Sequence, residues 1–416
     1  MMRVLWFTNS VSCYTSSTNS YNGGGWITSL ETEIRKKDGI ELGVCSYAHV
    51  PELNKVEKDG TIYYLLPRPK KSLKYTVETI FSKPEVSTFK HEKLAMPALI
   101  DIVNDFRPDV IQVFGTENIY GLIASYVHVP VVLHIQGILT ACANSFLPPT
   151  VSWKMYLFKD VKIRNILWRL SNMFALYRNC ITEQRIYRAV KYFIGRTALD
   201  KRITGILNPS AKYYHCDEII RETFYSDTNV RELPEKPVFV TTISSQLYKG
   251  YDMILKTAKC LKSIIGDFEW KVFGDVEPKF AERIFKIRRE AVNVHLMGVG
   301  SADRIKEILL SSTAYVHTSY IDNSPNSLCE AMLLGVPVIS TFVGGVPSIV
   351  EDGKTGMLVP ANDPFQMAWQ MAYLYNHKDI NIVIGKSAKE LALKRHNKET
   401  IVHKVLQIYR DMLNDS

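Results

Sequence analysis

Short apolar runs alternate with helical patterns along both halves of the chain, and this alternation constrains the fold more than any other feature. In the first half we expect strands at residues 4–7, 40–47, 61–66, 110–114 and 131–134, separated by helices at residues 26–36, 94–106 and 121–127. In the second half we expect strands at residues 238–243, 270–273, 294–297, 314–318 and 338–341, with a helix at residues 255–264. Strands that alternate with helices form parallel sheets with helices on both faces. The sequence therefore predicts an α/β fold.

The length of the chain predicts two such sheets, because 416 residues are too many for one ordinary core. We expect a Rossmann-like domain over residues 1–233 and a second one over residues 234–395, joined by a proline-flanked linker. The C-terminal residues 396–416 are expected to return and pack on the first domain. Ligands of wound sheets bind beyond the carboxyl ends of the strands. The site is therefore expected in a cleft between the two domains.

The composition and the cysteines indicate a folded protein of the cytoplasm. At 46% hydrophobic and 22% charged residues, the chain has the balance of a globular protein. The first residues lead directly into a strand pattern, and no run of ~18 apolar residues follows. Seven scattered cysteines, none in a Cys-x-x-Cys pair, argue for reduced thiols without a disulfide framework or a zinc site.

The positive charge is concentrated in residues 151–194. This segment holds nine Lys or Arg residues against Asp160 and Glu183, which is +7 of the net +9 of the chain. Aromatic residues such as Trp168 and Tyr177 lie between these cations, a pattern that suits an anionic membrane surface or a lipid-linked acceptor lying in it. The protein would then be peripheral on the inner face of the cell membrane. The other interpretation is a helical pair with aromatics in the core. Nucleic acid is not expected, since no recognised reader motif is present.

The segment 322–334 combines a helix start with a carboxylate inside an apolar helix. Ser324 is a good N-cap, and Pro325 fits the first helical position. The helix dipole makes the spot in front of the next N–H groups attractive to an anion, and these groups belong to Asn326, Ser327 and Leu328. Glu330 lies among apolar neighbours, where a carboxylate needs a partner. A ligand with a phosphate at one end and hydroxyls at the other would satisfy both features.

Two further segments have the composition of phosphate-contacting loops. Gly23, Gly24 and Gly25 open a helix after the first strand and let backbone N–H groups approach a ligand, although glycine triplets also serve as plain turns. Lys249 lies beside Gly250 at a helix start and can meet a diphosphate as a point charge. A solvated lysine is the plain alternative, but the helix dipole disfavours a cation at that end.

A histidine marks the end of one buried strand. His134 lies where active-site residues of wound sheets project, although a lone histidine is more often structural. A nicotinamide site is disfavoured, because the Gly-x-Gly-x-x-Gly spacing is missing after the first strand.

The segment 322–360, with Gly23–Gly25, His134 and Lys249-Gly250 in the same order, resembles the retaining glycosyltransferases of family 4. That resemblance implies a GT-B fold, in which two Rossmann-like domains face a cleft, and a nucleotide-diphosphate sugar, such as a UDP or GDP sugar, as donor. Residues 193–225 further resemble a bacterial subgroup that builds cell-surface polysaccharides such as capsules.

The resemblance also implies roles for residues of this chain. Glu330 would hold the ribose hydroxyls, and Asp322, one methylene shorter than the usual Glu, would approach the transferred sugar. The backbone of Asn326 and Ser327 would face the diphosphate, with Lys249 as the phosphate-binding lysine.

Two further positions depart from the family pattern. Ser244 lies near the place where an arginine is usual, and Ser348 stands where a glutamate is usual. The phosphate charge would then be met by Lys249, the helix terminus and a further cation such as Arg196.

The resemblance implies a hexosyltransferase that passes the sugar, with retention, to a hydroxyl of a glycan or polyprenyl-linked acceptor. The groups that stabilise the leaving diphosphate would be Lys249 and the N–H groups of Gly24, Gly25, Asn326 and Ser327. His134 would touch the donor sugar and help to align it. No metal or other cofactor is expected, since the cation and the dipole supply the charge. The alternatives are an epimerase or a phosphorylase of the same fold, or a sugar-nucleotide-binding protein that has lost catalysis.

Overall fold

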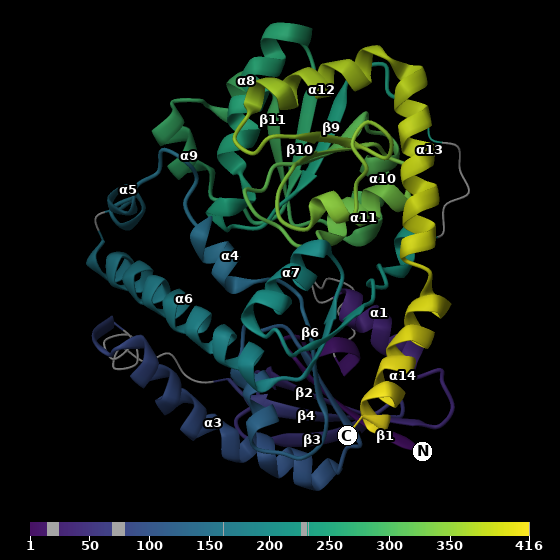
Figure 1. Ribbon diagram of the computed structural model, residues 1–416. Coiled ribbons are helices and arrows are strands. Elements are labelled where there is room, and N and C mark those ends of the chain that lie inside the picture. The colour runs from purple at the N-terminus through teal and green to yellow at the C-terminus, as the bar shows by residue number, and fades with distance from the viewer. Residues whose placement is uncertain (15–24, 69–79, 161, 226–230, 232, 416) are drawn as a thin grey trace.

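The computed structural model describes residues 1–14, 25–68, 80–160, 162–225, 231 and 233–415. The predicted contacts of Gly23 and Gly24 lie outside these ranges. Within them the chain forms two lobes, each built on its own sheet, as Figure 1 shows. Separate apolar cores lie on the two faces of the first sheet, and the same is true of the second. The predicted α/β fold with two wound domains is confirmed.

The first sheet has the strand order β3-β4-β2-β1-β5-β6-β7-β8. Its neighbours are parallel except for the hairpin pair of β3 and β4. The strands are β1 (Met2–Thr8), β2 (Ile40–Ala48), β3 (Asn54–Lys58), β4 (Thr61–Pro67), β5 (Val110–Phe114), β6 (Val131–His134), β7 (Tyr192–Gly195) and β8 (Lys212–His215). The central strands are continuous apolar runs because helices bury both of their faces.

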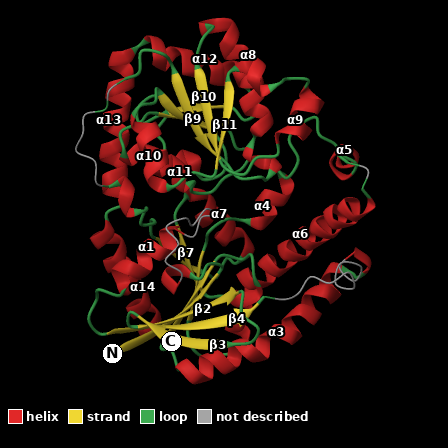
Figure 2. Cartoon of the chain, turned by 180° about the vertical axis from the view of Figure 1, so that it is seen from behind, coloured by secondary structure: helices red, strands yellow, loops and turns green. Residues whose placement is uncertain are grey.

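Helices α1, α3 and α6 flank this sheet (Figure 2). The helices of the first lobe are α1 (Gly25–Ile34), α3 (Pro84–Phe106), α4 (Leu139–Asn144), α5 (Trp153–Leu157), α6 (Ile163–Ala189) and α7 (Ala198–Leu207). The expected helix at residues 121–127 is instead the 3-10 helix η2 (Ile119–Ser125). Gly121 lets this segment pack closely on α6, because a Cβ there would lie 2.4 Å from the Ile186 side chain.

The second sheet is parallel throughout, in the order β11-β10-β9-β12-β13-β14. Its strands are β9 (Val238–Thr242), β10 (Glu269–Phe273), β11 (Val294–Gly298), β12 (Ala314–His317), β13 (Val338–Thr341) and β14 (Met357–Val359). The helices of this lobe are α8 (Tyr251–Ile265), α9 (Pro278–Phe285), α10 (Ala302–Leu310), α11 (Asn326–Leu333), α12 (Pro364–Asn376) and α13 (Lys378–Arg395). Among the helices of the described ranges, none has both the length and the hydropathy needed to cross a membrane.

The last helix, α14 (Lys398–Asn414), packs on the first lobe (Figure 1). Its apolar face shares a core with the first strand, and its Tyr409 is fully buried. The Tyr409 hydroxyl accepts a hydrogen bond from Trp6 Nε1 at 3.1 Å and donates one to the Gln112 side chain. The C-terminal helix is therefore joined to β1 and β5 by polar contacts as well as by packing.

Replacing Tyr409 with Phe is expected to lower the free energy of unfolding by about 1–3 kcal/mol, because it leaves buried polar groups of Trp6 and Gln112 without a partner. Tyr375→Phe is the matched control, since the Tyr375 hydroxyl donates to the Glu235 carbonyl near the surface, where water can replace it. Urea denaturation measures both variants. Equal losses for the two tyrosines would contradict the buried role.

Candidate active site

A cavity of about 720 Å³ lies between the two lobes, and both contribute to its wall. The lining residues follow strand ends: Gln136 after β6, Arg196 after β7, Ser244 after β9, Gly274 after β10 and Asp322 after β12. The carboxyl ends of strands from both sheets therefore meet at this boundary. A volume of this size is usual for a site that holds a small ligand.

Most of the predicted site residues share this one cavity. Those that line it are Gly25, Arg196, Ser244, Lys249, Asp322, Asn326, Ser327 and Glu330. Two others, His134 and Leu328, lie outside its lining. Glu117 and His317 also line it, although the sequence analysis did not single them out.

Asp322 is held by two cation-capable side chains. Lys249 Nζ lies 2.7 Å from Asp322 Oδ2, and His317 Nε2 lies 2.9 Å from the same oxygen. Burial would raise the pKa of Asp322, but Lys249 and His317 hold it well below its usual range. The carboxyl group is therefore ionised at neutral pH.

Lys249 is positioned by a close contact between two strand ends. Gly250, which follows it, has φ +81° and would place a Cβ only 2.1 Å from the Thr318 carbonyl oxygen. Thr318 Oγ1 in turn donates to the Lys249 carbonyl at 3.0 Å. Only glycine allows this approach, and the approach brings Lys249 beside Asp322.

Helix α11 begins one residue later than predicted, and its N-cap is Pro325, not Ser324. The Ser324 hydroxyl donates to Glu218 Oε1 across the lobe boundary, and the helix start has no side-chain cap hydrogen bond. The amides of Asn326 and Ser327 belong to the first turn, whose N–H groups have no partner within a helix. Leu328 differs, because its N–H donates to the Pro325 carbonyl at 3.0 Å and its side chain is buried in the core. Of the three predicted residues, Asn326 and Ser327 therefore line the cavity and Leu328 does not.

The buried carboxylate of Glu330 has a partner that the sequence did not identify. Arg221 Nε donates to Glu330 Oε1 at 2.7 Å, and both residues line the cavity. Burial raises the pKa of Glu330, and Arg221 offsets part of that rise. A lone glutamate in an apolar helix predicts a cation or a ligand beside it, but Arg221 is 109 positions away and no local signal marks it.

Arg196 lines the cavity with a guanidinium that is anchored in place. Its Nη2 donates to the Gln136 carbonyl at 2.6 Å, its Nε lies 3.9 Å from Glu218 Oε2, and its charge lies over the Trp26 ring. The guanidinium thus supplies a fixed positive charge in the cavity wall.

His134 lies behind the cavity wall, fully inside the first lobe. Its ring stacks on Phe114 with centroids 5.5 Å apart, and Nδ1 lies 3.2 Å from Gln112 Nε2. Burial, with Arg196 nearby, lowers the pKa of His134 to about 3, so the ring is neutral. The residue that reaches the cavity from this strand end is Gln136, two positions further on.

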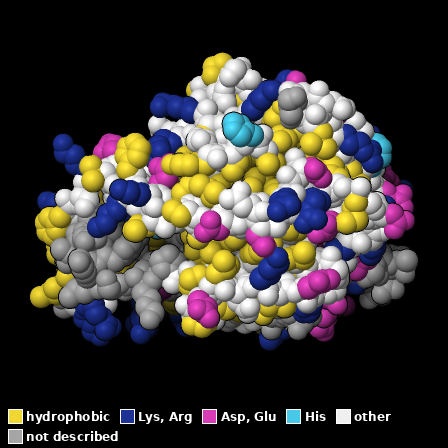
Figure 3. All heavy atoms as spheres, turned by 90° about the horizontal axis from the view of Figure 1, so that it is seen from below, with side chains coloured by type: hydrophobic (Ala, Val, Ile, Leu, Met, Phe, Trp, Pro, Cys, Tyr) yellow, Lys and Arg dark blue, Asp and Glu magenta, His cyan; other side chains and the backbone are white. Residues whose placement is uncertain are grey.

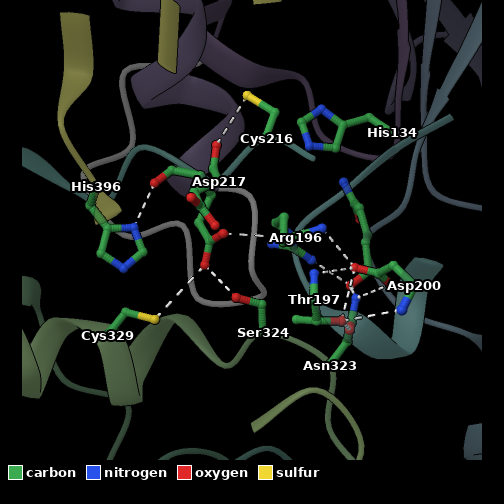
Figure 4. A network of polar contacts seen from close by, with 12 residues as sticks. His134, Arg196, Thr197, Asp200, Cys216, Asp217, Asn323, Ser324, Cys329 and His396 are labelled. Carbon is green, nitrogen blue, oxygen red and sulfur yellow. Dashed lines mark hydrogen bonds and ion pairs between the residues drawn. The ribbon is translucent and has the colours of Figure 1, made fainter. Parts of the chain in front are cut away.

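Within the described residues, one group of side chains has the composition of a metal site. Glu218, Cys329 and His396 lie buried together at the lobe boundary, as part of the network in Figure 4. Burial would raise the pKa of Glu218, yet Arg196, His396 and Arg395 lower it to about 2. Two guanidinium groups beside the cluster oppose the binding of a further cation. We therefore interpret it as a charge-compensated contact between lobes; that catalysis needs no metal stays a prediction.

The second lobe matches a known family. Residues 235–377 match the model of the family "Glycosyl transferases group 1". The chain is 28% identical over 164 residues to N-acetyl-alpha-D-glucosaminyl L-malate synthase of Bacillus anthracis, a match covering 39% of this chain and 42% of that protein. It is 27% identical over 154 residues to the putative colanic acid biosynthesis glycosyltransferase WcaL of Salmonella typhimurium, covering 35% of this chain and 38% of that one. Each match thus spans less than half of the relative's length.

Solved structures extend the likeness to both lobes. Sucrose-phosphate synthase from Thermosynechococcus elongatus superimposes with a TM-score of 0.73 over 100% of both chains, at 14% identity. Anabaena HepE, in complex with UDP and glucose, superimposes with a TM-score of 0.62 over 98% of this chain and 99% of that one, at 15% identity. The chain therefore has the fold of GT-B glycosyltransferases and carries a glycosyl transferases group 1 domain in its second lobe.

Asp322→Asn is expected to destabilise the protein at neutral pH by about 1.5–3 kcal/mol, because it removes a charged hydrogen-bond acceptor from Lys249 and His317. The folded-state pKa of Asp322 lies below its unfolded value of about 3.9, so this stabilisation is present above that pH and lost as the pH falls. The stability gap between wild type and variant should narrow from pH 7 toward pH 3 in urea titrations. A gap that stays constant would contradict the lowered pKa.

Proposed function

We propose that this protein is a retaining glycosyltransferase that moves a hexose from a nucleotide-diphosphate sugar to a hydroxyl of a glycan or lipid-linked acceptor. The observation that carries the proposal is the convergence of Lys249, the α11 amides and Glu330 on one cavity of a GT-B fold. The match of residues 235–377 to the glycosyl transferases group 1 model supports the reaction class. The UDP complex of HepE supports a nucleotide-bound donor.

In this proposal the main task of the cavity is to stabilise negative charge on the leaving diphosphate. The bond between the sugar C1 and the phosphate oxygen breaks, and a new C1–oxygen bond forms to the acceptor hydroxyl, whose proton ends on the released phosphate or in water. The amides of Asn326 and Ser327 lie at the helix start beside the cavity, and Lys249 would reach the diphosphate by leaving Asp322 Oδ2, which lies 2.7 Å away. Once placed there, these donors would stabilise the charge as it develops. Arg196 adds a fixed positive charge in the wall.

Two carboxylates would bind opposite ends of the donor. Glu330 would accept hydrogen bonds from the ribose hydroxyls, so the donor would compete with Arg221 for this carboxylate. Asp322 would accept from hydroxyls of the transferred sugar while Lys249 turns toward the diphosphate. His134 would act through Gln112 and the strand end rather than by contact with the sugar. Ser244 lines the cavity and would bind the donor where an arginine is usual.

For the acceptor, we propose a growing cell-surface polysaccharide, built at an anionic membrane. The name of the WcaL relative, which concerns colanic acid biosynthesis, supports such a role. The basic segment 151–194 provides the surface. On α6, Ile163 is 74% exposed, Trp168 is 58% exposed and Tyr177 is 62% exposed, whereas Tyr187 and Tyr192 are buried core. The buried tyrosines fit the interpretation as core, and the exposed aromatics support the proposed membrane surface.

The charge of this segment is partly neutralised. Ion pairs join Lys159 to Glu277, Arg169 to Asp160, Arg185 to Glu92 and Lys191 to Asp415. Helix α3 packs beside α6 and adds the exposed Val86, Phe89 and Leu94. Figure 3 shows hydrophobic side chains interspersed with both basic and acidic side chains on the face seen from below. Apolar side chains set among cations are what a peripheral membrane contact requires.

Lys249→Ala is expected to lower the rate of sugar transfer by about 10²–10³-fold, as loss of one donor that stabilises the developing charge does. Lys256→Ala is the matched control: Lys249 and Lys256 are 23% and 20% exposed, and each lies 2.7 Å from an aspartate oxygen, but Lys256 is paired with Asp252 on α8. Glu330→Ala should weaken donor binding by about 1.5–3 kcal/mol. Calorimetry with the donor found by a thermal-shift screen of nucleotide-diphosphate sugars, together with product analysis, measures these effects.

The same experiment separates the alternatives. A product in which the free nucleotide sugar has changed configuration would indicate an epimerase, a class for which Glu117 and His317 in the cavity wall would be suitable. A sugar 1-phosphate product would indicate a phosphorylase. Donor binding without turnover would indicate a binding protein. Unchanged donor affinity and transfer in both the Lys249 and Glu330 variants would contradict the site.

Replacing Trp168 and Tyr177 together with Ser is expected to weaken binding to vesicles containing phosphatidylglycerol by about tenfold or more, because burying one large aromatic contributes about 1.5–3 kcal/mol. Trp369→Ser is the control, since Trp369 is 63% exposed but lies on α12 of the other lobe. Co-sedimentation at two salt concentrations measures the binding. Binding that ignores lipid charge and salt would exclude the anionic surface.

A further inference from the structure

A single asparagine crosses from the second lobe into the first. Asn323 follows Asp322 in the loop between β12 and α11, and its side chain points at the start of α7 in the first lobe (Figure 4). Its Oδ1 accepts from Thr197 Oγ1 at 2.8 Å. Its Nδ2 donates to Asp200 Oδ1 at 2.8 Å and to the Gln136 carbonyl at 3.3 Å. All three partners belong to the first lobe.

The groups of the first lobe that contact Asn323 match the hydrogen-bonding pattern of an amide side chain. Thr197 and Asp200 form the capping box of α7, and Asp200 Oδ2 already accepts from the Arg196 and Thr197 amides. The remaining oxygen, Oδ1, needs a donor, and the Thr197 hydroxyl lies closer to Asn323 Oδ1, at 2.8 Å, than to its other acceptor, Asp200 Oδ2, at 3.1 Å. An amide offers one donor and one acceptor side by side. An aspartate in place of Asn323 could not donate, and it would face the Asp200 carboxylate.

The loop that carries Asn323 is held from behind by two glycines. A Cβ on Gly344 would lie 1.8 Å from the Asp322 carbonyl oxygen. A Cβ on Gly345 would lie 2.3 Å from the Asn323 carbonyl oxygen and 2.6 Å from Thr197 Cγ2. The Gly345 N–H donates to the Asp322 carbonyl at 3.0 Å. The loop is therefore enclosed between its own lobe and α7, with Asn323 only 6% exposed.

The same residue also orients the carboxylate beside it. The Asn323 N–H donates to Asp322 Oδ1 at 3.1 Å, while Lys249 and His317 contact the other oxygen. Gln136, whose carbonyl Asn323 contacts, also lines the cavity. The Asn323 side chain thus joins the loop between β12 and α11 to a cavity-lining residue of the first lobe.

We propose that Asn323 is a positioning residue that couples closure of the two lobes to the placement of Asp322 and the α11 amides. The inference rests on the proposed transfer reaction for its catalytic consequence, but the closure itself does not depend on that reaction. With the contact made, the cavity is assembled and water is excluded from the donor. When the lobes separate, the hydrogen bonds of Asn323 to Thr197 and Asp200 break. Asp322 then no longer keeps its position relative to Gln136.

The test is Asn323→Ala, with two readouts. Small-angle X-ray scattering should give a larger radius of gyration than wild type, because the lobes are less often closed. In steady-state kinetics kcat for transfer should fall by about tenfold to a hundredfold, as expected for a small misplacement of the reacting groups. The donor KM should change little, and the share of donor that is hydrolysed should rise.

Asn381→Ala is the matched control, since Asn381 is also a buried asparagine, with Nδ2 bonded to the Thr313 and Leu374 carbonyls inside the second lobe. It should lower stability without changing the scattering or the hydrolysed share. Asn323→Asp alone should act like Asn323→Ala or be worse. Combining it with Asp200→Asn restores a donor–acceptor pair and should recover part of both readouts.

An Asn323→Ala variant with wild-type scattering and a wild-type share of hydrolysis would overturn the proposal. The same holds if Asn381→Ala produces equal changes, because the effect would then be one of stability alone. If the wild-type protein transfers no sugar from any nucleotide donor, the proposed function fails. The scattering of Asn323→Ala and of the double variant Asn323→Asp, Asp200→Asn still decides whether Asn323 holds the lobes together.

Discussion

Charge is buried where the two sheets meet, and the compensation of that charge determines how the lobes lie against each other. Glu218 and Arg196 are both buried at the boundary, and Arg395 Nη2 lies 2.7 Å from Asp217 Oδ1 next to them. Removing one member of such a group would leave an ion without a partner away from water, which is strongly destabilising. The chain passes from one lobe to the other near Tyr225 and again near His396. The Tyr225 hydroxyl donates to the His396 carbonyl at 2.8 Å, so a hydrogen bond joins the two passages. The cavity exists because this contact keeps both sets of strand ends facing each other.

The chemistry of the cavity follows from that arrangement. Parallel strands direct their carboxyl ends to one edge of a sheet, and loops at that edge carry the polar side chains. When two such edges meet, residues as distant as Gln136 and Asp322 line one space. Backbone approaches that only glycine allows, at Gly250 and Gly344, then bring Lys249 and Asp322 within hydrogen-bonding distance. Arg196 and the start of α11 are held before any ligand arrives, so this part of the cavity is preorganised for a charged donor, whereas Lys249 and Glu330 would exchange their present partners for it.

Much of the fold could be predicted from local patterns, with the errors where the pattern is weak. The buried runs of β1, β5, β6 and β9 were identified because apolar strands are continuous in a wound sheet. The edge strands β3 and β8 were missed, since they are polar and partly exposed. β7 was not predicted either, because its four residues follow a helix directly at the end of the basic segment. Ser324 was assigned to a cap because a local rule cannot see Glu218 across the boundary.

The sequence by itself determined the two wound sheets, the helix start at α11 and the lysine and carboxylates that gather in the cavity, because each depends on spacing within a short stretch of chain. Only the tertiary structure decided which of these groups meet. It paired Glu330 with Arg221, placed Gln136 rather than His134 in the wall, and set Asn323 against Thr197 and Asp200. These partners are separated by many residues along the chain, and their contact depends on how two lobes pack, a property that no local pattern records.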